Sequence, residues 1–178
     1  MGNQAALSIR SLRGGLFISM DKDESYMRLA LEEAKAAYDE KEVPVGAILV
    51  MNDEVIGRGH NHRESLNAIH SHADIEAIED AAKKLGRWNL EGATLYVTLE
   101  PCLMCSGAII QSKISRIVYG ADDIERGAVV SKISAFEYFK NDACPLIFRG
   151  VLGEECKALI SAFFSEQRKQ KNNFETKK

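Results

Sequence analysis

Two short segments of the chain carry side chains that bind transition metals. They are His72-Ala73-Asp74 and Pro101-Cys102-Leu103-Met104-Cys105. One imidazole and two thiolates suit zinc, and three protein ligands leave the fourth position of a tetrahedral ion open. An open position is typical of a hydrolytic site, because the water that occupies it loses a proton near neutral pH. The spacing therefore predicts that His72, Cys102 and Cys105 hold one zinc ion per chain.

The two cysteines taken alone could equally form a thioredoxin-like redox pair or be two buried thiols. Cys102 and Cys105 are three residues apart, so on a helix they lie on one face. The positive end of a helix dipole would also favour their thiolate forms. His72, expected to begin a second helix across a cleft, favours zinc. His70 is interpreted as a bystander, because the step from Ala to an acid follows His72.

Hydrolysis at such a site also requires a group that moves protons. Asp74 is the nearby acid at the right offset from His72. Glu76 lies two residues further along and should point away in a helix begun at His72. A carboxyl in this place can take a proton from water and return it to the leaving group. Asp74 is therefore the candidate catalytic residue.

Length, composition and charge describe an ordinary globular protein. With 178 residues, of which 46% are hydrophobic and 28% charged, the chain fits one domain. A formal net charge of −3 gives no general affinity for nucleic acid, so RNA binding would need a local patch. No sequence segment reads as a membrane span or a secretory signal, so we expect a cytoplasmic protein whose cysteines are not disulfide-bonded.

The hydrophobic pattern predicts helices that alternate with strands. Apolar residues recur every three or four positions over 24–38, which is typical of an amphipathic helix. Residues 45–51 and 55–59 are predicted strands joined by a turn at Asn52-Asp53. The other expected elements are a helix at 75–85 closed by Gly86, a strand at 95–99, a helix beginning at Pro101, strands at 117–119 and 146–148, and a helix at 154–169. This order predicts an α/β fold with a sheet covered on both faces.

Longer stretches around the two motifs carry a family resemblance. The order H-x-E and then P-C-x-x-C is the signature of zinc-dependent base deaminases, in which the Glu is a general acid and base. Four segments resemble the bacterial tRNA-specific adenosine deaminases: 42–47, 59–61, 93–108 and 150–152. The resemblance covers about residues 24–170, and its T-L-Y-V-T-L-E-P-C-x-M-C stretch is far more specific than the metal motif alone.

The resemblance implies a three-layer α/β/α sandwich with a five-stranded mixed sheet, a homodimer, and conversion of the wobble adenosine of a tRNA anticodon to inosine. Asn61 would hydrogen-bond the flipped base and Val45 would pack against it. Asp123 would lie beside the flanking nucleotide, and Glu100 would support the site from behind.

The same resemblance assigns the last helix to contact with the anticodon loop. Its candidate residues are Phe163, Phe164, Arg168 and Lys169. Core packing is the alternative role for the two phenylalanines, and we favour it for at least one. Basic residues outnumber acidic ones after Ser165, which suits RNA phosphates but is also common in a solvated terminus.

The chain departs from the family pattern in four places. Asp74 replaces the Glu, and His70-Ser71 replaces Thr-Ala. Residues 127–131 replace a loop of small residues, and 141–144 stand where an Asn-His-Arg segment is common before the last strand. The Asp side chain is one methylene shorter, which withdraws the carboxyl by roughly 1.5 Å, and a misplacement of about 1 Å costs about 10²-fold in rate. Three interpretations of Asp74 follow. It is a working base whose carboxyl is placed differently, a substitution that disables the enzyme, or merely a first-turn helix residue stabilised by the helix dipole.

Three functions therefore remain open. The first is a tRNA adenosine deaminase, and the second is a deaminase of a free base or nucleoside of the guanine or cytosine type. The third is a catalytically impaired, zinc-stabilised protein that binds RNA or a partner.

The expected organisation is an N-terminal extension at 1–20, a zinc-dependent deaminase domain at 21–170 and a polar basic tail at 171–178. Residues 1–19 include Arg10 and Arg13 but no acidic residue, as in a transit peptide. We favour an upstream start codon or an added leader as the explanation of that composition.

Overall fold

The computed structural model describes residues 20–139 and 144–175. Their elements are α1 (Met20–Asp39), β1 (Gly46–Met51), β2 (Glu54–His60), α2 (Ala73–Leu85), β3 (Thr94–Leu99), α3 (Leu103–Gln111), β4 (Arg116–Ala121), α4 (Ala135–Tyr138), β5 (Leu146–Arg149) and α5 (Gly153–Glu175). The predictions made for residues 1–19, 141–143 and 176–178 lie outside the described residues.

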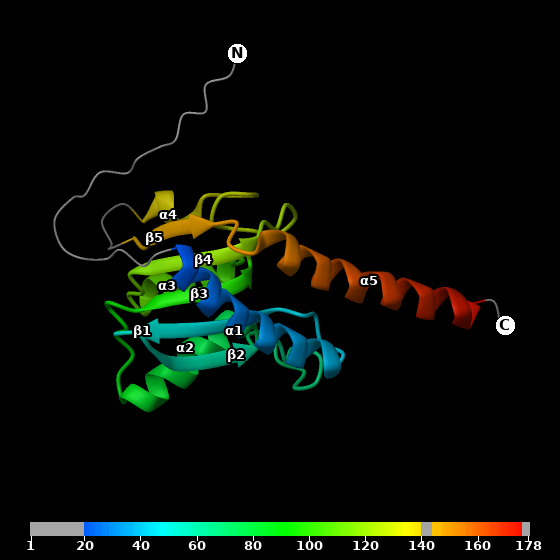
Figure 1. Cartoon of the computed structure of the whole chain (residues 1–178), viewed down its shortest axis with the longest axis horizontal. Coiled ribbons are helices and arrows are strands. Elements are labelled where there is room, and N and C mark those ends of the chain that lie inside the picture. Colours follow the sequence, from blue (N-terminus) through cyan, green and yellow to red (C-terminus); the bar gives the residue numbers. More distant parts are fainter. Residues whose placement is uncertain (1–19, 140–143, 176–178) are drawn as a thin grey trace, which may run out of the picture.

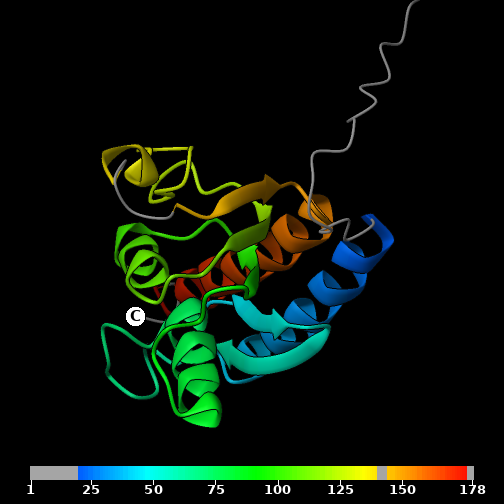
Figure 2. The same cartoon turned by 90° about the vertical axis from the view of Figure 1, so that its left-hand side faces the viewer.

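The strands form one mixed sheet in the order β2-β1-β3-β4-β5. β1 runs antiparallel to β2 and β3, whereas β3, β4 and β5 are parallel. Helices α1 and α5 cover one face of the sheet, and α2 and α3 cover the other (Figures 1 and 2). The expected three-layer α/β/α sandwich with a five-stranded mixed sheet is confirmed.

Successive side chains of the central strands enter different cores, because they point to opposite faces of the sheet. The core beneath α1 and α5 contains Ile48, Val50, Tyr96, Val118, Met27 and Cys156. The core beneath α2 and α3 contains Ala47, Leu49, Leu95, Val97, Ile117, Ala77 and Ile109. The central strands are therefore apolar on both sides, and their continuous hydrophobic runs follow from this double burial.

Two glycines let the helices lie directly on the sheet. A Cβ at Gly46 would stand 2.2 Å from the carbonyl oxygen of Ala30 in α1. A Cβ at Gly59 would stand 2.6 Å from the carbonyl oxygen of Ala73, in the first turn of α2. Real Cβ atoms do not approach so closely, so a larger residue at Gly59 would displace the helix start that follows His72.

The third predicted helix begins later than expected. We expected Pro101 in its first turn, but α3 starts at Leu103 with Cys102 as its N-cap. Cys102 is extended (φ −75°, ψ 176°) because it forms an antiparallel bridge with Gly127. The Pro101 carbonyl also accepts a hydrogen bond from the N–H of Ala128, at 2.8 Å. This pairing holds Pro101 and Cys102 in extended backbone and excludes them from the helix.

The other elements follow the sequence pattern with shifted ends. The turn at Asn52-Asp53 is confirmed, with φ values of 51° and 66°, and Gly86 closes α2 at φ 63°. The last helix continues past residue 169 to Glu175, and its C-terminal half projects beyond the sheet (Figure 1). The single turn of α4 was not predicted from the sequence.

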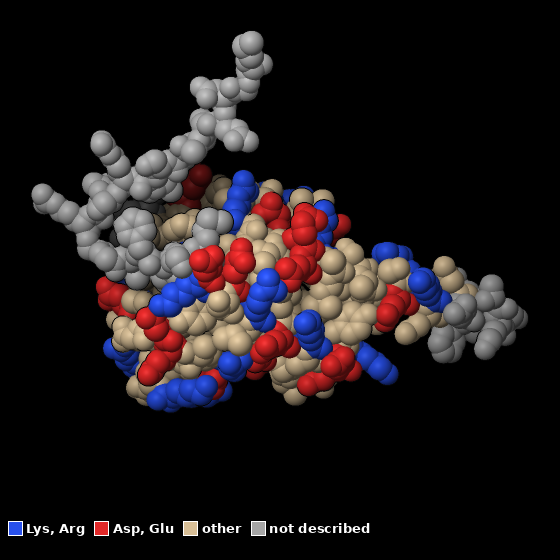
Figure 3. Space-filling model, in the orientation of Figure 1, with Lys and Arg blue, Asp and Glu red and all other residues tan. Residues whose placement is uncertain are grey.

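Basic and acidic side chains alternate over the face shown in Figure 3, without a continuous basic patch on the body of the domain. Basic side chains recur along the projecting part of α5 in the same view. Among the helices described, none has the length and apolar character that a membrane crossing would need.

A buried ion pair joins α1 to the sheet. The Arg116 guanidinium donates to both Asp23 carboxylate oxygens, at 2.9 and 2.6 Å. The Tyr96 hydroxyl donates to the same carboxylate at 2.8 Å. Asp23 and Arg116 are only 6% and 4% exposed, so each needs the other as its charge partner.

Asp23→Ala should lower the free energy of unfolding by about 3–5 kcal/mol, because it strands the buried Arg116 charge. Chemical denaturation at matched metal content measures the change. Asp21→Ala, at an exposed position in the same helical turn, is the control and should have little effect. Equal effects of the two substitutions would contradict the role assigned to this ion pair.

Candidate metal and catalytic site

The starts of α2 and α3 bring the three predicted ligands together. His72 is the N-cap of α2 and Cys102 the N-cap of α3, while Cys105 lies in the first turn of α3. The Nδ1 atom of His72 is 3.7 Å from the Cys102 sulfur and 3.5 Å from the Cys105 sulfur. The two sulfurs are 3.6 Å apart. These three atoms form a nearly equilateral triangle that could hold a metal ion.

The environment of Cys102 favours the thiolate that a metal requires. The sulfur-to-sulfur hydrogen bond between Cys102 and Cys105, together with the contact with His72, lowers the pKa of Cys102 to about 4. The hydrogen bond to Cys102, assisted by burial, raises the pKa of Cys105. The Cys102 thiolate likewise raises the pKa of His72. The low pKa of Cys102 is consistent with its expected role as a thiolate ligand.

Asp74 lies beside this triangle in the first turn of α2. Its side chain is 4% exposed, and burial raises its pKa to about 6, although a hydrogen bond with Cys105 opposes this rise. The Oδ1 atom is buried without a hydrogen-bond partner. A buried acceptor left unpaired is costly, by about 1–3 kcal/mol, so it usually marks a bound group or a catalytic role. Glu76 does not line the cavity around the triangle.

A cavity of about 830 Å³ opens over the triangle, within the size range of small-molecule sites. Val45, Asn61 and Asp123, the predicted substrate contacts, line it together with His72, Cys102 and Asp74. The remaining lining residues are Val43, Arg63, Ala73, Leu99, Glu100, Asp122, Ile124, Glu125, Arg126, Ile160, Ser161 and Phe164. Residues distant in the sequence therefore converge on one space.

Glu42 fixes the orientation of the Asn61 amide. The Nδ2 atom of Asn61 donates to Glu42 Oε2 at 3.0 Å, so the amide nitrogen is directed at Glu42. The backbone N–H groups of Glu64 and Ser65 also donate to this carboxylate. Burial acts to raise the pKa of Glu42, but these hydrogen bonds lower it overall. Glu42 was not predicted as a site residue, although it opens one of the segments that carry the resemblance.

Glu100 holds the loop that forms another wall of the cavity. Its Oε1 atom accepts the backbone N–H groups of Val129, Val130 and Ser131, at 3.1, 2.8 and 2.9 Å. Its Oε2 atom accepts the N–H of Asp123 at 3.0 Å. Burial opposes ionisation, but these donors keep the pKa of Glu100 below its usual value. The carboxylate is 2% exposed and fastens the loop from behind.

The predicted contacts on α5 divide between the core and the cavity. Phe163, predicted to touch substrate, is 7% exposed, does not line the cavity, and packs edge-on against Tyr38 at 5.7 Å between ring centroids. Phe164 is 43% exposed and lines the cavity. Arg168 is exposed further along the helix and does not reach the cavity.

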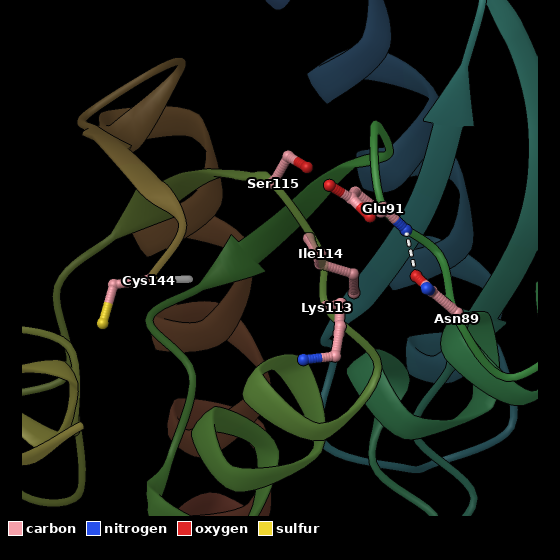
Figure 4. A pocket seen from close by; sticks show the side chains of 6 residues that line it. All are labelled: Asn89, Glu91, Lys113, Ile114, Ser115 and Cys144. Atoms are coloured by element: carbon pink, nitrogen blue, oxygen red, sulfur yellow. Dashed lines mark hydrogen bonds between the residues drawn. The ribbon is translucent and has the colours of Figure 1, made fainter. Parts of the chain in front are cut away.

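A smaller cavity of about 390 Å³ lies away from the triangle. Its lining residues are Asn89, Glu91, Lys113, Ile114, Ser115 and Cys144. Figure 4 shows that these side chains point in different directions rather than toward one centre. This cavity has no arrangement that suggests chemistry, so the candidate site is the larger one.

The sequence of the chain is similar to those of known proteins. Residues 20–121 match the family described as the cytidine and deoxycytidylate deaminase zinc-binding region. The tRNA-specific adenosine deaminase of Bacillus subtilis (strain 168) is 46% identical over 152 residues, covering 85% of this chain and 94% of the relative. The Haemophilus influenzae protein of the same name is 43% identical over 150 residues, covering 84% and 87%.

Solved structures with the same fold include proteins of this kind. One, from a study of A-to-I editing by tRNA:A34 deaminases at the wobble position of transfer RNA, is 41% identical with a TM-score of 0.73. It covers 76% of this chain and 98% of its own. A guanine deaminase from Nitrosomonas europaea, 22% identical over 86% of this chain and 96% of its own with a TM-score of 0.69, shares the fold. The chain belongs to the tRNA-specific adenosine deaminases, within the cytidine and deoxycytidylate deaminase zinc-binding family.

Proposed function

We propose that the chain is a zinc-dependent deaminase that converts adenosine to inosine at the wobble position of a tRNA anticodon, with Asp74 as its proton-transfer group. One observation carries the proposal: the buried, unpartnered carboxylate oxygen of Asp74 lies beside the His72-Cys102-Cys105 triangle in a cavity of suitable size. The names of the relatives supply the substrate class.

The triangle has the dimensions that zinc requires. Tetrahedral bonds of about 2.3 Å to sulfur and about 2.1 Å to nitrogen place the ligand atoms about 3.6–3.8 Å apart. The observed separations are 3.5, 3.6 and 3.7 Å. His72, Cys102 and Cys105 therefore fit a zinc ion with little movement. When bound, zinc supplies Lewis-acid chemistry that activates a water molecule as the nucleophile.

Asp74 would perform the proton transfers of the reaction. Its free Oδ1 can take a proton from water that attacks C6 of the adenine ring. The same carboxyl delivers that proton to the ring nitrogen, then takes the proton of the hydroxyl group added at C6 and passes it to the amine, which leaves as ammonia while C6 becomes a carbonyl. Asn61, whose amide nitrogen is held by Glu42, would present its amide oxygen to the base and orient the base for attack.

The C-terminal helix supports an RNA substrate rather than a free base. Arg168, Lys169 and Lys171 are exposed where α5 projects beyond the sheet (Figure 1). Phe164 precedes this basic segment on α5 and lines the cavity, where its ring could stack on an unpaired base. A base flipped into the cavity would thus place its flanking phosphates toward α5.

Exposed apolar residues near the ligands support a homodimer. Leu103 and Met104, in the first turn of α3, are 60% and 36% exposed. Leu66 and Ile69, in the segment that leads to His72, are 60% and 79% exposed. Exposed apolar groups are typical of an interface, and a second copy packed against either pair would lie close to a segment that carries a metal ligand.

Cys102→Ala should abolish binding of the thiolate-ligated ion, because it removes one of three protein ligands. Cobalt substitution measures this through the sulfur-to-metal absorption band. Cys144→Ser, at an exposed cysteine outside the triangle, is the matched control and should keep the band. An unchanged band in Cys102→Ala would refute the assigned ligand set.

Asp74→Asn should lower single-turnover inosine formation by about 10²–10⁴-fold at unchanged zinc content, because the amide cannot carry the proton. Asp74→Glu restores the longer reach and should raise the rate by about 10²-fold. If the wild-type chain is active and Asp74→Asn keeps that activity, another group must move the proton. Activity found only in Asp74→Glu would mean that the shorter side chain disables the enzyme.

The double substitution Arg168→Ala with Lys169→Ala should weaken binding of an anticodon stem-loop and reduce its dependence on salt, because fewer counterions are released. Fluorescence anisotropy at several salt concentrations measures both. Lys83→Ala with Lys84→Ala, on the exposed end of α2, is the charge-matched control. An equal loss of affinity in both double variants would argue against a phosphate-binding role for α5.

A further inference from the structure

His60 and His62, the two chain neighbours of Asn61, form with Glu40 a second group of side chains that could hold a metal ion. His60 is the last residue of β2, and His62 lies two residues further along the chain. Their ring centroids are 4.2 Å apart. Glu40, just past the end of α1, reaches both rings: its carboxylate oxygens lie 3.5 Å from His60 Nε2 and 3.4 Å from His62 Nε2.

The arrangement around His60 leaves a lone pair without a partner. The Glu33 carboxylate lies 3.1 Å from His60 Nδ1, and Glu33 is also paired with Arg58 at 3.2 Å. When Nδ1 carries a proton directed at Glu33, Nε2 is the ring nitrogen that meets Glu40. That Nε2 atom is buried and makes no hydrogen bond. A nitrogen lone pair that faces a carboxylate oxygen requires a proton or a cation between them.

The distances suit a cation. Nitrogen and oxygen ligands at about 2.0–2.2 Å from a tetrahedral ion are about 3.3–3.6 Å apart. The two nitrogen-to-oxygen separations, 3.5 and 3.4 Å, fall in this range, and all the ligand atoms lie within 4.8 Å of one another. The contact of Glu33 with the far nitrogen of His60 matches the carboxylate-histidine pairs that orient metal-binding imidazoles.

We propose that Glu40, His60 and His62 form a second binding site, for a divalent cation of the zinc type, distinct from the His72-Cys102-Cys105 site. Imidazole and carboxylate ligands suit this class of ion, and the half-exposed Glu40 gives it access from solvent. The ion ties the end of α1 to the two neighbours of Asn61. Its role is to stiffen the segment that presents Asn61 to the cavity, and the site does not depend on the deaminase reaction.

The test is a zinc titration of the full chain, followed by equilibrium dialysis and metal analysis. The wild-type chain should bind two ions, and the second should raise the melting temperature. His62→Leu should bind one ion and lose the second stabilisation. His70→Leu, which changes an exposed histidine outside both clusters, should bind two.

Cobalt distinguishes the sites without reference to activity, because only the ion at Cys102 and Cys105 gives a sulfur-to-metal band. His62→Leu should keep this band at full strength. Glu40→Gln, at a half-exposed position, provides a second variant if His62→Leu fails to fold. A single ion in the wild-type chain, or two ions in both variants, would overturn the proposal and leave the cluster as a hydrogen-bonded ion-pair network.

Discussion

The meeting of two helix N-termini at one point is the constraint on which the rest of the site depends. It places an imidazole and two sulfurs within 3.5–3.7 Å, and neither helix could do so alone. Gly59 lets the first turn of α2 lie against β2, which locates His72. The bridge between Cys102 and Gly127 delays the start of α3, which turns Cys102 toward the same centre. The metal site is thus assembled by backbone packing.

Two buried carboxylates hold the walls of the cavity on this base. Glu42 and Glu100 are 1% and 2% exposed, and burial of an ionised group is costly unless hydrogen bonds offset it. Backbone N–H groups of neighbouring loops supply those bonds. Each carboxylate therefore loses its hydration water but gains backbone hydrogen bonds, and these bonds fix the position of a loop. Asp74 differs, because one of its oxygens has no such donor and remains available for chemistry.

The sequence alone predicted the features that depend on local spacing. The metal triad follows from the types and offsets of its residues, and the layers follow from hydrophobic periodicity. Features that depend on tertiary contacts were not predictable. Phe163 and Phe164 are adjacent on one helix, and contacts with residues distant in the sequence, such as that between Phe163 and Tyr38, decide which of them is buried. The bond between Glu42 and Asn61 and the extended backbone at Cys102 likewise need partners distant in the sequence.

The proposed function requires the cavity to take an adenosine from RNA. The most direct measurement is a single-turnover reaction of the zinc-loaded chain with an anticodon stem-loop that carries a wobble adenosine, with free adenosine and guanine tested in parallel. We expect inosine at that position of the RNA and no product from the free compounds. Deamination of a free base or nucleoside, with the RNA unchanged, would contradict the proposed function.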